Sequence, residues 1–162
     1  MLIREMTLQD VAQVAAIEKE CFSMPWSEQS LVDSVTREDT IFLVCEDDVC
    51  DDMLPEEGKT LQTETVGYIG MYVSFEEGDI TNVAVSPAHR KKGYGEALVS
   101  KAKELAKEKQ LEMILLEVRV SNEPAISLYK KMGFEKLGLR KNFYEHPVED
   151  AIIMRCPLRT LE

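Results

Sequence analysis

The chain has little of what marks a disulfide-bonded or metal-binding protein. Its 162 residues include four cysteines and two histidines. The cysteines are Cys21, Cys45, Cys50 and Cys156. They lie far apart without a C-x-x-C pair, which favours buried thiols over a disulfide framework or a zinc site. His89 and His146 are too isolated to suggest a metal cluster, so no metal is expected.

Long apolar runs and an excess of basic residues are also missing. No segment approaches the roughly 20 apolar residues of a membrane span, and residues 1–5 show no secretory pattern, so we expect a cytoplasmic protein with no membrane partner. There are 19 Lys and Arg against 30 Asp and Glu, a net charge of −11. This charge argues against direct nucleic-acid binding, which needs Lys and Arg clustered over a broad face.

What the sequence does contain fits one domain over residues 1–162, because 44% hydrophobic residues supply a sizeable core. The charge is uneven. Residues 46–57 are strongly acidic, within an expected hairpin insertion at about 46–64, whereas residues 89–92 read His-Arg-Lys-Lys. A basic spot on an acidic protein suits a small anionic ligand better than a polymer. The acidic remainder either attracts a cationic substrate or serves solubility.

Hydrophobic periodicity and capping residues predict an α/β fold, a central mixed β-sheet of about seven strands with helices on both faces. Strands are expected at residues 2–6, 40–45, 65–75, 80–85, 113–120, 134–140 and 151–158. Helices are expected between Thr7 and Pro25, after Ser27, over 95–110 and from Asn122 to about 132. Residues 40–45 and 65–75 form a hairpin, and Gly78-Asp79 makes the next turn. The strand-helix-strand unit from 80 to 118 implies a parallel pair.

The segment Arg90-Lys91-Lys92-Gly93-Tyr94-Gly95 follows an expected strand and opens an expected helix. Its amide groups would stand at a helix N-terminus, where anions bind, and the glycines permit positive φ and close backbone approach. A pyrophosphate is the natural ligand. On these six residues alone, a solvated basic loop is the alternative. The segment lacks the Lys-Ser/Thr of a Walker loop and does not read G-x-G-x-x-G.

Further motifs follow in order: R-x-x-G-x-G comes after a Val-x-Val-x-Pro strand and before E-V-R-x-S-N-x-x-A-I-x-L-Y-x-x-x-G-F. Other supporting segments are residues 22–27, 116–122, 125–129, 133–134, 142–144 and 149–154. Together they resemble the GNAT acetyltransferase superfamily over nearly the whole chain, and within it the ribosomal-protein-alanine N-acetyltransferases. The combined order is highly specific, whereas the phosphate loop alone identifies only the superfamily.

The resemblance implies an enzyme that transfers acetyl from acetyl-CoA to the N-terminal α-amino group of a protein, such as a ribosomal protein that begins with alanine. Attack would be direct, in a ternary complex of a monomer or weak dimer. It implies that Glu117 is the proton acceptor and Tyr129 the proton donor. The implied acetyl-CoA contacts are Val83, Ala84 and Val85 for the pantetheine arm, Lys91, Lys92, Gly93, Tyr94, Gly95 and Glu96 for the pyrophosphate, and Asn122.

The two implied catalytic residues also make chemical sense. An α-amino group has a pKa near 8 and must lose a proton before it attacks a thioester, and Glu117, on an expected interior strand, is a carboxylate that could accept that proton. Tyr129, two turns beyond the Asn122 cap, could protonate the departing thiolate. By themselves, Glu117 could equally be an outward-facing charge, and Tyr129 would more simply be a core aromatic. The oxyanion would rest on backbone N–H groups near Val85.

On the acceptor side, Pro25-Trp26-Ser27 resembles the superfamily's substrate-binding loop and Asn142-Phe143-Tyr144 the facing connection. Trp26 could instead be simple core packing. Phe143 stands where relatives often have Tyr, and residues 145–148 differ from the common Pro-x-Asp/Asn-Gly turn. These departures put the peptide preference in question more than the chemistry.

Two other functions stay open at this point. The same machinery could acetylate a small polyamine, an antibiotic or a lysine side chain. A groove beside Trp26 and Tyr144 would favour a peptide, whereas a closed acidic pocket would favour a small cation. The chain could also be a catalytically silent CoA-binding regulator, although the presence of both Glu117 and Tyr129 counts against that reading. The cysteines show no basic partner nearby in sequence that would mark an acyl-accepting nucleophile.

Overall fold

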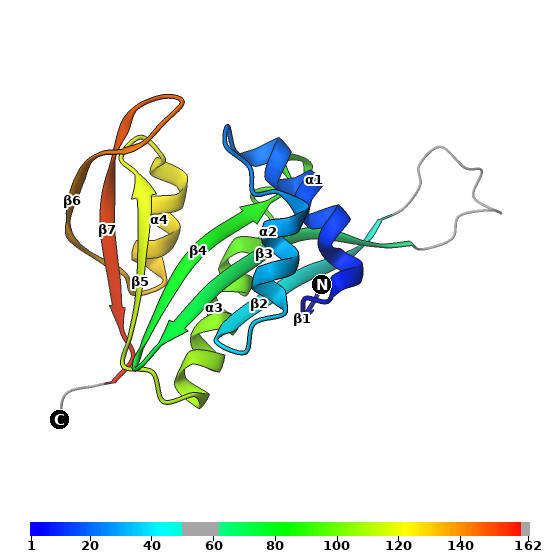
Figure 1. The fold of residues 1–162 in the computed structure, drawn as a ribbon, viewed down its shortest axis with the longest axis horizontal. Coiled ribbons are helices and arrows are strands. Elements are labelled where there is room, and N and C mark those ends of the chain that lie inside the picture. The colour runs from blue at the N-terminus through cyan, green and yellow to red at the C-terminus, as the bar shows by residue number, and fades with distance from the viewer. Residues whose placement is uncertain (50–61, 160–162) are drawn as a thin grey trace.

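A computed structural model of the chain describes residues 1–49 and 62–159 (Figure 1). Cys50 and the middle of the expected insertion lie outside the described residues. The strands are β1 (Leu2–Glu5), β2 (Thr40–Val49), β3 (Gln62–Ser74), β4 (Glu77–Val85), β5 (Met113–Arg119), β6 (Glu135–Tyr144) and β7 (Glu149–Pro157). The helices are α1 (Val11–Cys21), α2 (Glu28–Val35), α3 (Tyr94–Glu108) and α4 (Glu123–Lys131). The predicted order of strands and helices is confirmed.

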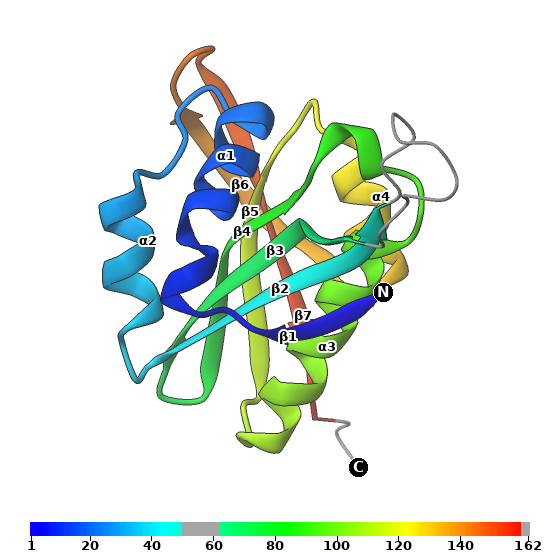
Figure 2. The ribbon, with the colours of Figure 1, turned by 90° about the vertical axis from the view of Figure 1, so that its right-hand side faces the viewer.

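The strands form one mixed sheet in the order β1-β2-β3-β4-β5-β7-β6. The pairing of β4 with β5 is parallel, as the strand-helix-strand unit predicts, and the other pairings are antiparallel. Helices α1 and α2 cover one face of the sheet, and α3 and α4 cover the other (Figure 2). The mixed α/β architecture with helices on both faces is therefore confirmed.

Each face of the sheet has its own hydrophobic core. Val14, Leu31 and Tyr68 belong to the core beneath α1 and α2. Leu98 and Leu116 belong to the larger core beneath α3 and α4. Because successive side chains of a strand point to opposite faces, the same strands supply both cores.

The sheet opens at the carboxyl end of its central parallel pair. The parallel pairing of β4 with β5 ends where Ile80 pairs with Leu116. On the other side of β4, a bulge in the pairing with β3 leaves Thr81 without a partner residue on β3. Beyond this point the two strands diverge (Figure 1). Ligands of parallel sheets bind at strand carboxyl ends, and the divergence exposes one edge of β4 over Thr81–Val85.

One local prediction is wrong. Gly78-Asp79 is not a turn, because β4 already begins at Glu77 and the turn is centred on Phe75, with φ of 55° and a side chain that is 98% exposed. Gly78 serves close packing instead, since a Cβ there would lie 2.6 Å from Met71 Sδ.

Strand pairing extends into the expected insertion, since β2 continues through residues 46–49 and β3 begins at Gln62. Two of the acidic residues on this extension have partners. Arg4 Nε donates to Glu46 Oε1 at 2.9 Å, and the Tyr94 hydroxyl donates to Asp47. Paired carboxylates can therefore continue a strand where composition alone favours a polar loop.

Candidate active site

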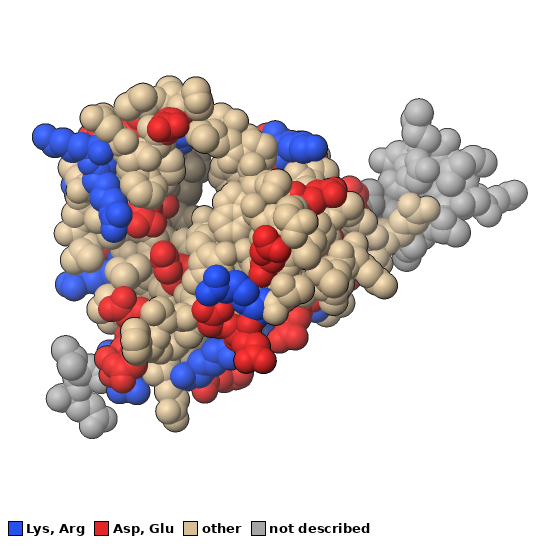
Figure 3. All heavy atoms as spheres, in the orientation of Figure 1, with Lys and Arg blue, Asp and Glu red and all other residues tan. Residues whose placement is uncertain are grey.

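A cavity of about 610 Å³ lies where β4 and β5 diverge. In the space-filling view it appears as a hollow between the two halves of the molecule (Figure 3). Six of the predicted site residues line it: Val83, Glu117, Asn122, Tyr129, Trp26 and Tyr144. They come from β4, β5, both ends of α4, the α1–α2 connection and the end of β6. The fold thus joins segments that are far apart in the sequence into one site.

Glu117 lies on β5 between two buried residues, Leu116 and Val118. The strand alternation turns the Glu117 side chain away from those neighbours, and it is 23% exposed. Its Oε1 atom lies 3.8 Å from Arg140 Nη2. Desolvation and the nearby charge of Glu117 raise the pKa of Asp79 on β4. Glu117 is therefore a partly buried carboxylate within a charged group of side chains.

Tyr129 is 8% exposed on the last turn of α4, and its ring packs against Phe134 with centroids 5.7 Å apart. Burial raises the pKa of Tyr129 well above its usual range, so the phenol stays protonated at neutral pH. Its hydroxyl makes no hydrogen bond with any residue that the structure describes. A protonated, unengaged phenol facing a cavity is suited to donating a proton.

The predicted phosphate loop stands at the N-terminus of α3, outside the cavity lining. Gly93 is the N-cap with φ of 86°, and Lys91 also has a positive φ of 63°. The first intrahelical bond runs from Ala97 N to Gly93 O at 3.0 Å, which leaves the preceding amides directed outward. Glu96 Oε2 instead pairs with Lys131 Nζ at 2.8 Å. An anion here would meet the backbone amides rather than the Glu96 side chain.

Ala84 and Val85, the other two predicted contacts on β4, fall outside the cavity lining. Ala84 is buried on β4, and the Val85 carbonyl accepts from Cys21 Sγ at 3.4 Å and from Arg90 Nε at 3.2 Å. Val83, Ala84 and Val85 pair with β3 on one side, and the parallel pairing with β5 does not reach them. That exposed edge has the geometry needed to accept an added extended ligand.

Three predicted acceptor-side residues do not line the cavity, namely Pro25, Ser27 and Asn142. Ser27 Oγ accepts from Ser30 N at 3.1 Å and caps α2. Asn142 has φ of 53°, and its N–H donates to Asp150 Oδ1 at 2.9 Å. Ser27 and Asn142 therefore shape the backbone around the site, while Trp26 and Tyr144 reach into it.

The sequence analysis did not predict Arg119 as a site residue, although it lines one side of the cavity. Its guanidinium donates to the carbonyl oxygens of Glu145 and Pro147, each at 3.0 Å, and to Glu149 Oε1 at 3.2 Å. It also lies 4.4 Å from the centroid of the Tyr144 ring. Partial burial raises the pKa of Tyr144 to about 12. Arg119 thus fixes the β6–β7 connection against the end of β5.

Cys21 and Glu18 also line the cavity and were not predicted as site residues. Arg90 Nη2 lies 3.4 Å from Cys21 Sγ, a basic neighbour that sequence proximity could not reveal. Burial nevertheless raises the pKa of the Cys21 thiol, so it is not an activated nucleophile. Glu18 is fully buried on the apolar face of α1. A charged residue four positions after Val14, at core spacing, is the signal that could have found it.

Two structural findings concern other classes of site. Among residues 1–49 and 62–159, no three His, Cys, Asp or Glu side chains are grouped to hold a metal ion. Within the same ranges, no helix is long and apolar enough to cross a membrane. Cys45 and Cys156 are buried free thiols, as predicted, and Cys21 is a partly exposed one.

Comparisons with known proteins agree with this geometry. A model of the "Acetyltransferase (GNAT) family" matches residues 11–134. A Bacillus subtilis protein provisionally named ribosomal protein bS18-alanine N-acetyltransferase is 37% identical over 94% of this chain and 92% of its own. The ribosomal-protein-S18-alanine N-acetyltransferase structure from Escherichia coli matches with a TM-score of 0.81 and 26% identity over 99% and 96% of the two chains. Arabidopsis thaliana NAA60 in complex with acetyl-CoA shares the fold (TM-score 0.77, 17% identity, 96% and 97% covered).

Proposed function

Because the chain belongs to the GNAT acetyltransferase family, we propose that it transfers acetyl from acetyl-CoA to the α-amino group of a protein N-terminus, with a ribosomal protein that begins with alanine as the acceptor. The observation that carries the proposal is the placement of Glu117 and Tyr129 around one cavity at the opening between β4 and β5. The bacterial relatives named for ribosomal protein bS18 or S18 support the choice of acceptor. Such a substrate would place the enzyme in the cytoplasm.

The reaction would proceed by direct attack. Glu117 accepts a proton from the acceptor's ammonium group, directly or through water, and the neutral nitrogen attacks the thioester carbonyl carbon. As the carbon–sulfur bond breaks, the sulfur leaves as a thiolate and takes a proton from Tyr129. The nitrogen loses its second proton to the resulting phenolate, directly or through water, and Glu117 releases the first proton to solvent. This sequence forms an amide and free CoA without a covalent enzyme intermediate. Burial raises the pKa of Tyr129, so its phenol is protonated when the reaction begins, and the second proton from the nitrogen restores that form.

The donor would bind along the exposed edge of β4 and across the N-terminus of α3. The backbone of Val83, Ala84 and Val85 would pair with the pantetheine arm in the place that β5 leaves open. The backbone of Tyr94, Gly95 and Glu96 would receive the pyrophosphate, with the preceding Lys91, Lys92 and Gly93 beside it. Asn122, whose side chain accepts from Ala125 N at 3.3 Å, would contact the donor from the start of α4.

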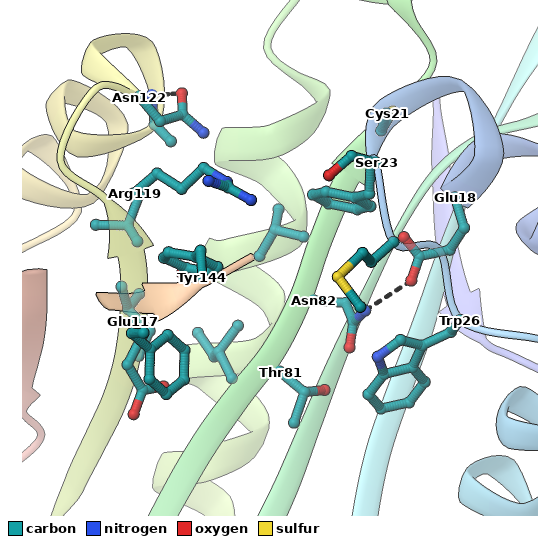
Figure 4. Close-up of a pocket in the computed structure, with 18 of the residues that line it drawn as sticks. Glu18, Cys21, Ser23, Trp26, Thr81, Asn82, Glu117, Arg119, Asn122 and Tyr144 are labelled. Carbon is teal, nitrogen blue, oxygen red and sulfur yellow. Dashed lines mark hydrogen bonds between the residues drawn. The ribbon is translucent and has the colours of Figure 1, made fainter. Parts of the chain in front are cut away.

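The acceptor would enter from the side of Trp26 and Tyr144. These two aromatic residues come from the α1–α2 connection and the end of β6, on opposite sides of the cavity (Figure 4). Phe143, which is 45% exposed, packs edge-on against Tyr144 with centroids 5.0 Å apart. A peptide that passes between Trp26 and Tyr144 would present its first residue to Glu117.

The test is to incubate the protein with acetyl-CoA and a peptide panel that varies the first residues, beside polyamines and lysine-containing blocked peptides, and to follow CoA release. We expect turnover of free N-termini, with alanine preferred. Turnover restricted to polyamines or to lysine side chains would overturn the peptide proposal. Binding of acetyl-CoA without turnover of any amine would overturn the catalytic assignment and support the regulator reading.

A further inference from the structure

Glu18 is a fully buried carboxylate that lines the cavity opposite Glu117 (Figure 4). It lies near the end of α1, where it is held by residues from two strands. Its Oε1 atom accepts from the Tyr68 hydroxyl and from Asn82 Nδ2, each at 2.7 Å. Tyr68 is itself fully buried. The Glu18 side chain therefore has a fixed orientation, set by β3 and β4.

Two acceptor oxygens at this position have no hydrogen-bond partner among the described residues, Glu18 Oε2 and Asn82 Oδ1. The bond from Asn82 Nδ2 to Glu18 identifies the other atom of that amide as the oxygen. Buried polar atoms are rarely left unpaired, because desolvation without a hydrogen bond costs free energy. Two such acceptors on one wall of a cavity call for a ligand group that donates at least two hydrogen bonds.

The charge at this position is also unbalanced. Tyr68 and Asn82 donate hydrogen bonds to the Glu18 carboxylate, and the Trp26 backbone amide also favours the charged form of Glu18. Burial is the larger effect, and it raises the pKa of Glu18. No Lys, Arg or His among the described residues forms an ion pair with it, whereas Glu117 has Arg140 at 3.8 Å. A buried carboxylate without a cation is costly, so a ligand group that carries positive charge would stabilise the ionised form of Glu18.

We propose that Glu18 Oε2 and Asn82 Oδ1 form the subsite that binds the acceptor's primary amino group. The proposal rests on the proposed acetyltransferase function. Within that function, Glu18 and Glu117 have different roles. A primary ammonium group supplies up to three N–H donors and the positive charge that this wall lacks. Glu18 and Asn82 hold the amine and fix its position, and Glu117 on the other wall accepts the proton that it must lose.

The test compares two peptides that differ in one group, an alanine-initiated peptide and its desamino counterpart, in which a propionyl group replaces the first residue. Binding is measured with CoA present, so that no acetyl transfer occurs. Glu18→Gln keeps an oxygen that accepts from Tyr68 and Asn82 but removes the charge. Glu20→Gln is the matched control, because Glu20 is exposed on the same helix.

We expect Glu18→Gln to weaken binding of the amine peptide by about 10- to 100-fold, the range of a hydrogen bond to a charged group, and to leave the desamino peptide unchanged. KM for the peptide should rise by a similar factor. Glu20→Gln should change neither. Asn82→Ala removes the second acceptor, and it should also reduce the preference for the amine over the desamino peptide.

If Glu18 has only a structural role, Glu18→Gln would weaken binding of both peptides equally, or it would lower the thermal unfolding midpoint without changing the ratio of the two peptide affinities. Either result would overturn the proposal. An unchanged KM in Glu18→Gln, with wild-type peptide turnover intact, would do the same. If the wild type turns over only a small amine such as spermidine, the peptide function fails. A raised KM for that amine in Glu18→Gln would still support the subsite, and an unchanged KM would reject it.

Discussion

The catalytic assignment depends on one carboxylate at the centre of β5. Replacing Glu117 with Gln keeps the size of the side chain but removes its ability to accept a proton, so we expect kcat to fall by about 10²- to 10⁴-fold, the usual contribution of a general base. Acetyl-CoA affinity should stay near that of the wild type, because the implied donor contacts lie on β4, α3 and α4. Steady-state kinetics and calorimetric titration measure the two effects. A wild-type rate would remove Glu117 from the mechanism.

Tyr129 should act through its hydroxyl and not through its ring. In Tyr129→Phe the packing against Phe134 remains, so the fold should be unaffected, while the departing thiolate loses its proton donor. Because a thiolate is already a fair leaving group, we expect kcat to fall by about 10- to 100-fold, at or below the low end of the range for acid catalysis.

The matched control for that variant is Tyr144→Phe, which removes a hydroxyl from the same cavity. Tyr144 lies on the acceptor side beside Arg119, so its loss should raise KM for the peptide with little change in kcat. Equal losses of kcat in the two variants, measured under saturating substrates, would contradict the assignment of the proton donor to Tyr129.

At the level of elements, the N-terminus of α3 depends on one backbone conformation. Gly93 has φ of 86°, and no atom lies within 4 Å of where its Cβ would be, so the cost of Gly93→Ala is conformational and amounts to about 1 kcal/mol. If the helix entry relaxes to relieve that strain, its amides turn away from the pyrophosphate. We expect acetyl-CoA affinity to fall by roughly fivefold, measured by titration calorimetry.

Gly138 provides the control for this prediction. It also has open space around its Cβ position, but it lies in β6 without a positive φ. Gly138→Ala should leave acetyl-CoA affinity unchanged. A loss of affinity in both variants, or in neither, would mean that the left-handed conformation of Gly93 is not what shapes the donor site.

The features that the sequence predicts correctly are those that depend on neighbouring residues. The caps at Ser27 and Asn122 and the strand-helix-strand unit around α3 follow from local patterns, and the structure contains them. The turn before β4 could not be predicted, because it uses a strained Phe75 while Gly78 is needed for packing against Met71. The local sequence does not show that tertiary packing requires a glycine at position 78.

The missed half of the candidate site has the same physical cause. Glu18 is 50 residues from Tyr68 and 64 residues from Asn82, and its burial, orientation and unpaired oxygen exist only when α1 packs on β3 and β4. Arg119 likewise makes its contacts with the β6–β7 connection, 26 to 30 residues downstream. Glu117 and Tyr129 could be predicted from the sequence because a motif that contains both resembles a known family.

For the whole molecule, stability in acid should depend on an ion-pair network that ties β1 to the start of α1 and to β2. Arg4 Nη1 and Nη2 contact the two Asp10 oxygens at 2.8 Å each, and Arg4 Nε also contacts Glu46. The hydrogen bonds from Arg4 outweigh desolvation and lower the pKa of Asp10. This lowered pKa means that the network stabilises the folded state above the unfolded pKa of about 3.9, and that its contribution is lost as pH falls through the lower folded value.

We therefore expect Asp10→Asn to lower the free energy of unfolding by about 1–2 kcal/mol at pH 7, an amount limited by the partial exposure of Arg4. The deficit should shrink toward pH 3 as wild-type Asp10 begins to protonate. Urea denaturation at several pH values measures both trends. Asp39→Asn is the control, because Asp39 and its partner Arg37 are both about half exposed and their pair should contribute little. Equal deficits in the two variants, or a deficit that persists unchanged in acid, would show that geometry at Arg4 does not control the acid stability of the fold.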